Sequence, residues 1–130
     1  MHKEEVELFL RRARNFLEGA KERFEKNDWD LTCFMAEQSV QLFLKATILE
    51  KGGEFPRTHS LRQLFSILSN LIEKSELKYD RRSLLFLESA YLNSRYINFS
   101  YNEEDAEEIL KIVEEVLELV RNVRNHEKSS

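Results

Sequence analysis

Hydrophobic side chains recur every three or four residues along most of the chain, which is the period of an amphipathic α-helix. The first such stretch covers about residues 3–26. Asn27 and Asp28 end it, and Asp28 is a suitable N-cap for a second helix that extends to about Lys51. A Gly-Gly pair follows, which favours the end of that helix.

Three further helices are predicted by the same pattern. After the loop "GGEFPRTHS", either Thr58 or Ser60 can cap a third helix, and Asp80 can cap a fourth. Asn102 can cap the last helix, whose first turn is acidic, as the helix dipole favours. No stretch alternates as a strand would.

The predicted fold is all-α, an antiparallel helical bundle of about five helices. Because the connections are short, we expect an up-and-down four-helix core with one short extra helix. The chain of 130 residues is long enough for one domain, residues 1–130. We expect about 3–125 to be ordered and 126–130 to form a frayed tail.

The second helix is apolar on two sides, so it is either central or in contact with a partner. One stripe begins at Trp29 and Cys33. The second consists of Met35, Leu42, Ala46 and Leu49. We expect a homodimer that forms through this second stripe.

Composition narrows the class of protein. With 42% apolar and 34% charged residues the chain is globular, and its net charge of -4 does not indicate general nucleic-acid binding. A local cationic cleft for RNA stays open. No segment has the length and hydrophobicity of a membrane span or a signal peptide, so we expect a cytoplasmic protein. High Glu, Lys and Arg with little Gly or Pro is a weak hint of a thermophilic source.

The residues that most often hold metals or form disulfides are scarce. Cys33 is the lone cysteine and lies in an apolar helical segment, which favours a buried side chain over a nucleophile. The sequence contains no Cys/His cluster and no Glu-x-x-His pair. We therefore predict no metal site and no cofactor.

Three segments taken together resemble the HEPN family of small all-helical prokaryotic domains. They are "ARNFLEGAKERFEKNDWDLTCF", "CFMAEQSVQLFLKATILEKGGEFPRTHSLRQLF" and "LNSRYINFS", and they cover nearly the whole chain in the expected order. The resemblance implies a helical bundle. It also implies two family properties: many members are metal-independent ribonucleases with an Arg-x4-6-His motif, and many pair with a minimal nucleotidyltransferase as toxin and antitoxin.

The resemblance matches Arg95 to the family's catalytic arginine, which would hold a phosphate by charge and forked hydrogen bonds. The motif histidine should follow at position 100, 101 or 102, but these are Ser100, Tyr101 and Asn102. Imidazole titrates near pH 6.5 and exchanges protons at neutral pH, whereas tyrosine titrates near 10. The missing histidine argues against an enzyme, although an active endoribonuclease that uses Arg95 remains an alternative.

Two other histidines bear on this prediction. His59 in "RTHSL" is interpreted as a capping and loop-docking residue rather than a ligand or base. Arg121 and His126 have the motif spacing, but they lie at the end of the last helix, where the family does not place the motif. If His59 or His126 lay in contact with the Arg95 guanidinium, the argument against an enzyme would fail.

The candidate ligand site is therefore Arg95 with Tyr96 and Tyr101, which could hold a phosphate and stack on a base. Alternatively, Tyr91 and Phe99 close the end of the bundle while Arg95 pairs with an acidic residue. The resemblance further implies that a nucleotidyltransferase partner could modify the hydroxyl of Tyr101 or Tyr96.

The favoured function is a nucleotide- or phosphate-binding module, or an interaction module, that works with a nucleotidyltransferase-type partner. The alternatives are the endoribonuclease, with an RNA ligand, and a structural homodimer without ligand.

Overall fold

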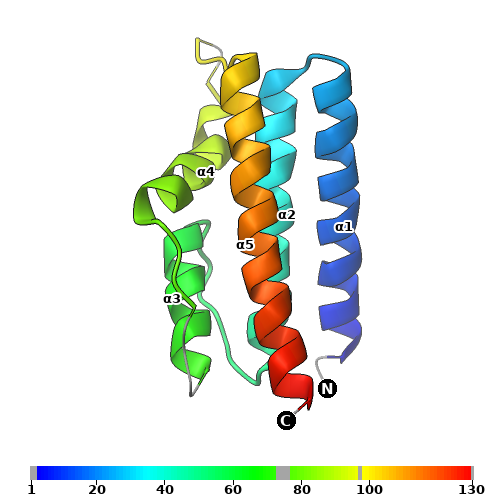
Figure 1. Ribbon diagram of the computed structural model, residues 1–130, viewed down its shortest axis with the longest axis vertical. Helices are drawn as coiled ribbons and strands as arrows, with labels where there is room; N and C mark the ends of the chain where they lie inside the picture. The colour runs from blue at the N-terminus through cyan, green and yellow to red at the C-terminus, as the bar shows by residue number, and fades with distance from the viewer. Residues whose placement is uncertain (1–2, 73–76, 97, 130) are drawn as a thin grey trace.

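The computed structural model describes residues 3–72, 77–96 and 98–129, and the side chains from position 126 onward are excluded. These residues form five helices and no strand (Figure 1). The helices are α1 (Lys3–Glu25), α2 (Trp29–Glu50), α3 (Leu61–Leu71), α4 (Arg81–Asn93) and α5 (Glu103–Ser129). The predicted all-α fold is confirmed. The frayed tail stays a prediction, since α5 is helical to Ser129 but its last side chains are not described.

Each of the last four helices begins at a predicted N-cap. The capping side chains belong to Asp28, Ser60, Asp80 and Asn102. Of the two candidates for α3, Ser60 is the cap, and its hydroxyl accepts a hydrogen bond from the Gln63 amide at 3.2 Å. Satisfying these free amides fixes where each helix starts.

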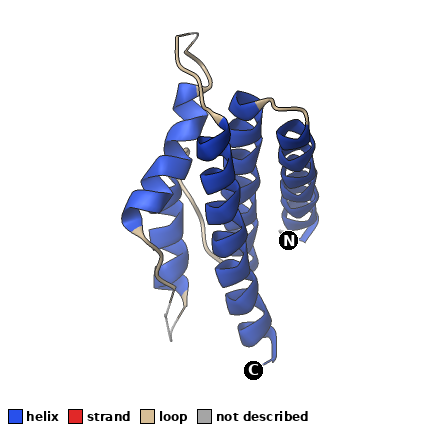
Figure 2. Cartoon of the chain, turned by 45° about the horizontal axis from the view of Figure 1, so that its top comes forward, coloured by secondary structure: helices blue, strands red, loops and turns tan. Residues whose placement is uncertain are grey.

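The two connections next to α2 depend on unusual backbone positions. Asn27, between α1 and α2, has φ of 62°, a conformation that asparagine tolerates better than most residues. After α2, Gly52 has φ of 82°, and a Cβ on Gly53 would lie 2.4 Å from Leu71 Cδ1. The predicted Gly-Gly stop is thus required by conformation at one position and by close packing at the other. Figure 2 shows the short first turn and the longer segment to α3.

Helix α2 is the centre of the bundle. It packs against the other four helices and has buried residues along most of its length. Figure 1 shows α1 on one side of it, α5 alongside, and α3 and α4 one above the other on the remaining side. Two short helices therefore occupy the place of one long helix.

The second apolar stripe of α2 is covered by α1. Met35 lies so close to Gly19 that a Cβ there would be 2.9 Å from the Met35 sulfur. Ala46 and Leu49 are buried in a cluster with Val6 of α1. Helix α1 of the same chain therefore occupies much of the surface at which the homodimer contact is expected.

Among the described residues, no helix combines the length and the hydrophobicity that a membrane span requires.

Candidate functional site

Arg95 lies in the turn that follows α4. The turn is held by backbone hydrogen bonds from the Ser94 amide to Ala90 O at 3.2 Å and from the Arg95 amide to Leu92 O at 3.1 Å. It directs the exposed Arg95 side chain back over Tyr91, one helical turn earlier, with Cζ 4.3 Å from the ring centroid. Nη2 also donates a hydrogen bond to the Tyr91 hydroxyl. The guanidinium is therefore oriented by an aromatic ring.

The Tyr91 ring is also in contact with a histidine. His59, from the loop before α3, stacks on it with a centroid distance of 4.0 Å and an interplanar angle of 19°. His59 Nε2 lies 3.1 Å from the Tyr91 hydroxyl. One hydroxyl group thus links an imidazole to the Arg95 guanidinium, although no histidine follows Arg95 at the motif spacing.

A polar face of α2 continues this chain of contacts. The Gln41 side-chain oxygen lies 3.2 Å from His59 Nδ1 and accepts a hydrogen bond from Lys45 Nζ at 3.1 Å. Gln41 Nε2 donates to the Glu37 carboxylate at 2.9 Å. An amide oxygen only accepts, so the neutral imidazole carries its proton on Nδ1 and presents Nε2 as an acceptor to Tyr91.

Burial favours the neutral forms of Glu37, His59 and Lys45. Burial raises the pKa of Glu37 to about 7, although hydrogen bonds from Gln38 and Gln41 oppose the shift. The pKa of His59 is lowered by burial and by the positive charges of Lys45 and Arg95. Burial also lowers the pKa of Lys45. At neutral pH, His59 is therefore mainly a neutral base.

Glu88 of α4 anchors the loop that carries His59. Its carboxylate accepts hydrogen bonds from Ser60 Oγ at 3.0 Å, from Arg62 Nε at 3.2 Å and from Arg62 Nη2 at 3.0 Å. Burial alone would raise the pKa of Glu88, but these hydrogen bonds lower it. The start of α3 is thereby tied to the helix that carries Tyr91.

The other two predicted ligand residues lie in different environments. Tyr96 is 59% exposed, whereas Tyr101 is only 7% exposed. The Tyr101 ring packs against Phe99 and Phe86, its amide donates to Asp30 Oδ1 at 2.6 Å, and its hydroxyl accepts from Asn93 at 3.1 Å. Tyr101 is thus a core residue, whereas we expected from the sequence that its ring would be available to a ligand.

A hollow of about 200 Å³ lies beside this turn. It is lined by Asp30, Asn93, Ser94, Tyr96, Phe99 and Tyr101. Asp30 is one helical turn before Phe34, whose ring stacks on the Tyr91 ring with a centroid distance of 6.4 Å. Asp30 and Phe34 therefore lie on the same side of α2, about 6 Å apart along its axis.

The alternative in which Arg95 pairs with an acidic residue is not observed among the described residues. Within residues 3–72, 77–96 and 98–125, no carboxylate forms a salt bridge with Arg95. Phe99 remains 42% exposed, so Tyr101 closes this end of the core instead. The second candidate histidine, His126, lies outside the described side chains.

Neither the cysteine nor a metal cluster offers another site among the described residues. Cys33 is fully buried, and burial, with the nearby charges of Asp105 and Asp30, raises the pKa of its thiol to about 12. No group of three His, Cys, Asp or Glu side chains there could hold a metal ion.

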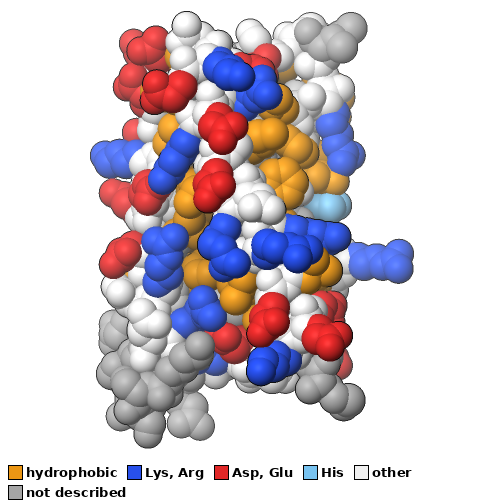
Figure 3. Space-filling model, turned by 90° about the vertical axis from the view of Figure 1, so that its right-hand side faces the viewer, with side chains coloured by type: hydrophobic (Ala, Val, Ile, Leu, Met, Phe, Trp, Pro, Cys, Tyr) orange, Lys and Arg blue, Asp and Glu red, His pale blue; other side chains and the backbone are white. Residues whose placement is uncertain are grey.

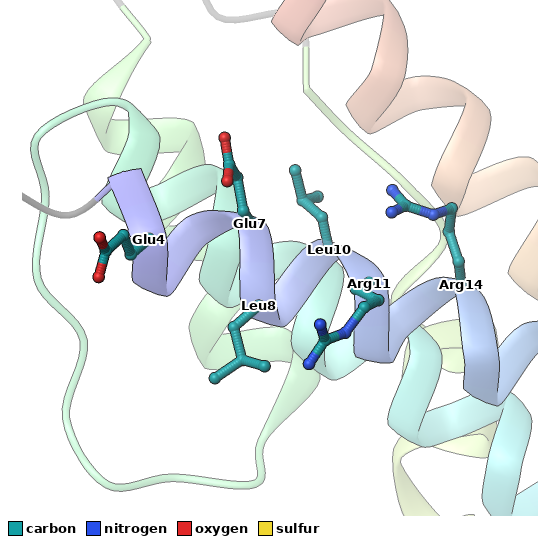
Figure 4. Close-up of a pocket in the computed structure, with 6 residues that line it drawn as sticks. All are labelled: Glu4, Glu7, Leu8, Leu10, Arg11 and Arg14. Atoms are coloured by element: carbon teal, nitrogen blue, oxygen red, sulfur yellow. The ribbon is translucent and has the colours of Figure 1, made fainter.

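A larger hollow, of about 510 Å³, follows the outside of α1. In Figure 4, its Leu10 and Arg14 point to one side of that helix and Leu8 and Arg11 to the other.

Sequence reasoning missed the polar face of α2. Glu37, Gln41 and Lys45 recur every four residues, which places them on one side of a helix. Tyr91 and Arg95 have the same spacing. Both spacings can be recognised in the sequence. The contact between His59 and Tyr91 cannot, because it joins two residues that are far apart in the chain and no local pattern indicates it.

Comparison with known proteins relates this geometry to a family. The HEPN domain model matches residues 6–123. The crystal structure of TT1696 from Thermus thermophilus has a TM-score of 0.72 and 23% identity, and the match covers 91% of this chain and 97% of that chain. For ST0689, an archaeal HEPN homologue, the TM-score is 0.66 and the identity 23%, with coverages of 90% and 95%. Both likenesses concern the fold. No curated protein sequence matches the chain significantly.

Proposed function

The chain belongs to the HEPN domain family, and we propose that it binds a nucleotide through the cluster of Arg95, Tyr91 and His59, with Arg95 holding a phosphate group. The observation that carries this proposal is the environment of the Arg95 guanidinium. It is exposed and held over the Tyr91 ring, and no carboxylate of the described residues forms a salt bridge with it. A fixed planar cation of this kind is suited to forked hydrogen bonds with phosphate oxygens.

The hollow of about 200 Å³ supports a nucleotide over a simple phosphate ion. Tyr96 and Phe99 are exposed aromatic rings on which a base can stack. Asp30 and Asn93 add hydrogen-bonding groups to the same hollow. Since Ser94 and Tyr96 flank Arg95 in the chain, one ligand can place its base there and its phosphate on the guanidinium.

Titration calorimetry with ATP, AMP and adenosine tests the proposal. We expect both phosphate-bearing ligands to bind at least about tenfold more tightly than adenosine, because hydrogen bonds to a charged group contribute about 1.5–3 kcal/mol. Arg95→Gln should remove that preference, whereas Arg81→Gln, at an exposed arginine of α4, should keep it. Equal affinity for AMP and adenosine would contradict the proposal. Absence of any binding would favour the structural homodimer without ligand.

A nucleotidyltransferase-type partner is proposed from the family resemblance. The accessible target would be Tyr96, which lies next to Arg95 and is 59% exposed, and not the buried Tyr101. After incubation with ATP and such a partner, mass spectrometry should find an adduct on Tyr96 that is lost in Tyr96→Phe. An adduct that persists in this variant, or none, would count against the modification.

A homodimer also remains a proposal, and it needs a surface other than the second stripe of α2. Leu85 and Leu92 are 44% and 56% exposed and share a face of α4. Light scattering should give a dimer for the unmodified chain and a monomer for Leu92→Glu. A monomer in both cases would contradict the dimer.

The endoribonuclease is the second candidate function, and His59 is the observation that favours it. A neutral imidazole linked through Tyr91 to the Arg95 guanidinium supplies the base that the motif lacks. If it is active, the purified protein should cleave total RNA in the presence of EDTA. Both Arg95→Ala and His59→Gln should abolish cleavage. Intact RNA with the unmodified chain would exclude this activity.

A further inference from the structure

Helices α1 and α5 both pack on α2 (Figure 1). Residues of all three helices line a groove between α1 and α5, which contains a hollow of about 260 Å³. Phe43 of α2 forms part of its floor, Leu17 of α1 and Leu117 of α5 part of its walls. None of its lining residues belongs to the cluster around Arg95.

Three arginines border this apolar floor. Arg14 comes from α1, and the other two come from α5. The Cζ atom of Arg121 lies 6.0 Å from the Phe43 ring centroid, and that of Arg124 lies 5.5 Å from it. Arg124 is paired with Glu50, with Nε–Oε1 and Nη2–Oε2 distances of 2.7 and 3.0 Å.

Arg14 and Arg121 differ from Arg124 because they are exposed and lack such a pairing. In the part of the chain that the structure describes, neither has a carboxylate within salt-bridge distance. Figure 3 shows Lys and Arg side chains in a band across the middle of the face that α1 presents, beside exposed hydrophobic side chains. The hollow therefore combines an apolar floor with two uncompensated positive charges.

The length of the groove limits what it can hold. A salt bridge between Lys21 of α1 and Glu114 of α5, at 3.2 Å, crosses it at one end. The lining residues of α1 extend only from Leu10 to Leu17, which is about 11 Å of helix. A short molecule fits this length, but a partner helix of several turns does not.

We propose that this groove binds a small organic anion, a carboxylate with an apolar chain of medium length. The carboxylate would pair with Arg14 and Arg121, and the chain would lie on Phe43 between Leu17 and Leu117. This site is separate from the proposed nucleotide site, so either proposal can fail without the other.

Titration calorimetry with octanoate, octan-1-ol and sulfate tests the proposal on the full chain. We expect octanoate to bind, and octan-1-ol and sulfate each to bind at least about tenfold more weakly, because each lacks one half of the interaction. ATP should not compete with octanoate. Equal binding of octan-1-ol would show an apolar hollow without an anion site, and equal binding of sulfate would show an anion site without an apolar contribution. Either result would overturn the proposal.

Variants locate the site. Arg14→Gln and Arg121→Gln should each weaken octanoate binding about tenfold, whereas Arg12→Gln, at an exposed arginine of α1 outside the hollow, should not. Circular dichroism should show that all three variants remain helical, since the replaced side chains are exposed. Unchanged octanoate affinity in Arg14→Gln and Arg121→Gln would refute the proposal.

Discussion

Glu37 is the residue whose environment differs most from that of an ordinary carboxylate. It is fully buried in α2, and its two oxygens accept hydrogen bonds from Gln38 at 2.8 Å and Gln41 at 2.9 Å. Because burial raises its pKa to about 7, it is protonated over a wider pH range in the folded chain than in the unfolded one. Its ionisation therefore opposes folding.

Replacing Glu37 with Gln should make stability less dependent on pH. A carboxyl with a raised pKa contributes fully below its unfolded pKa, near 4.5, and this contribution is lost as pH rises to about 7. Relative to Glu37→Gln, the unmodified chain should lose up to about 3 kcal/mol between pH 4.5 and 8. Urea unfolding at both pH values measures this, with Glu18→Gln, at an exposed residue, as control. A difference that does not change with pH would contradict the assignment.

Cys33 gives a second prediction at this scale. Its thiol is fully buried and its pKa is raised to about 12, so little thiolate forms at pH 8. Iodoacetamide should modify it slowly in the native chain and at least about a hundredfold faster in urea. Mass spectrometry measures the rate of modification. Rapid modification of the native chain would mean that α2 opens far more readily than its packing implies.

Among the elements, α5 has the clearest start signal. The Asn102 side chain accepts a hydrogen bond from the Asp105 amide at 2.8 Å, and the Asp105 side chain accepts one from the Asn102 amide at 3.0 Å. This reciprocal pair satisfies two backbone amides at the start of the helix.

Removing this cap should destabilise the bundle measurably. We expect Asn102→Ala to lower the free energy of unfolding by about 1 kcal/mol, since no other side chain replaces the lost acceptor. The matched control is Asn122→Ala, an exposed asparagine inside the same helix, which should be neutral or slightly stabilising. Thermal or urea unfolding measures both. Equal effects of the two variants would mean that the reciprocal hydrogen bonds do not form in solution.

At the scale of the whole molecule, the sequence predicted the features that depend on residues close together in the chain. The starts of four helices follow from side chains such as Asp80 and Asn102, which act within one turn of their own position. The arrangement around Arg95 was not predictable in this way, because His59 and Tyr91 meet only when α3 is packed beside α4. For the same reason, the sequence did not predict the burial of Tyr101 by long-range packing.

The most direct test of the account uses the histidine ring signals in nuclear magnetic resonance. The chain contains three histidines, and His59→Gln identifies the signal of His59. On titration with AMP, the His59 ring and the Arg95 Nε–H signals should shift together and saturably, and adenosine should leave Arg95 largely unchanged. If AMP shifts neither signal, or shifts only the other two histidines, the phosphate does not bind beside Arg95 and the central claim is wrong.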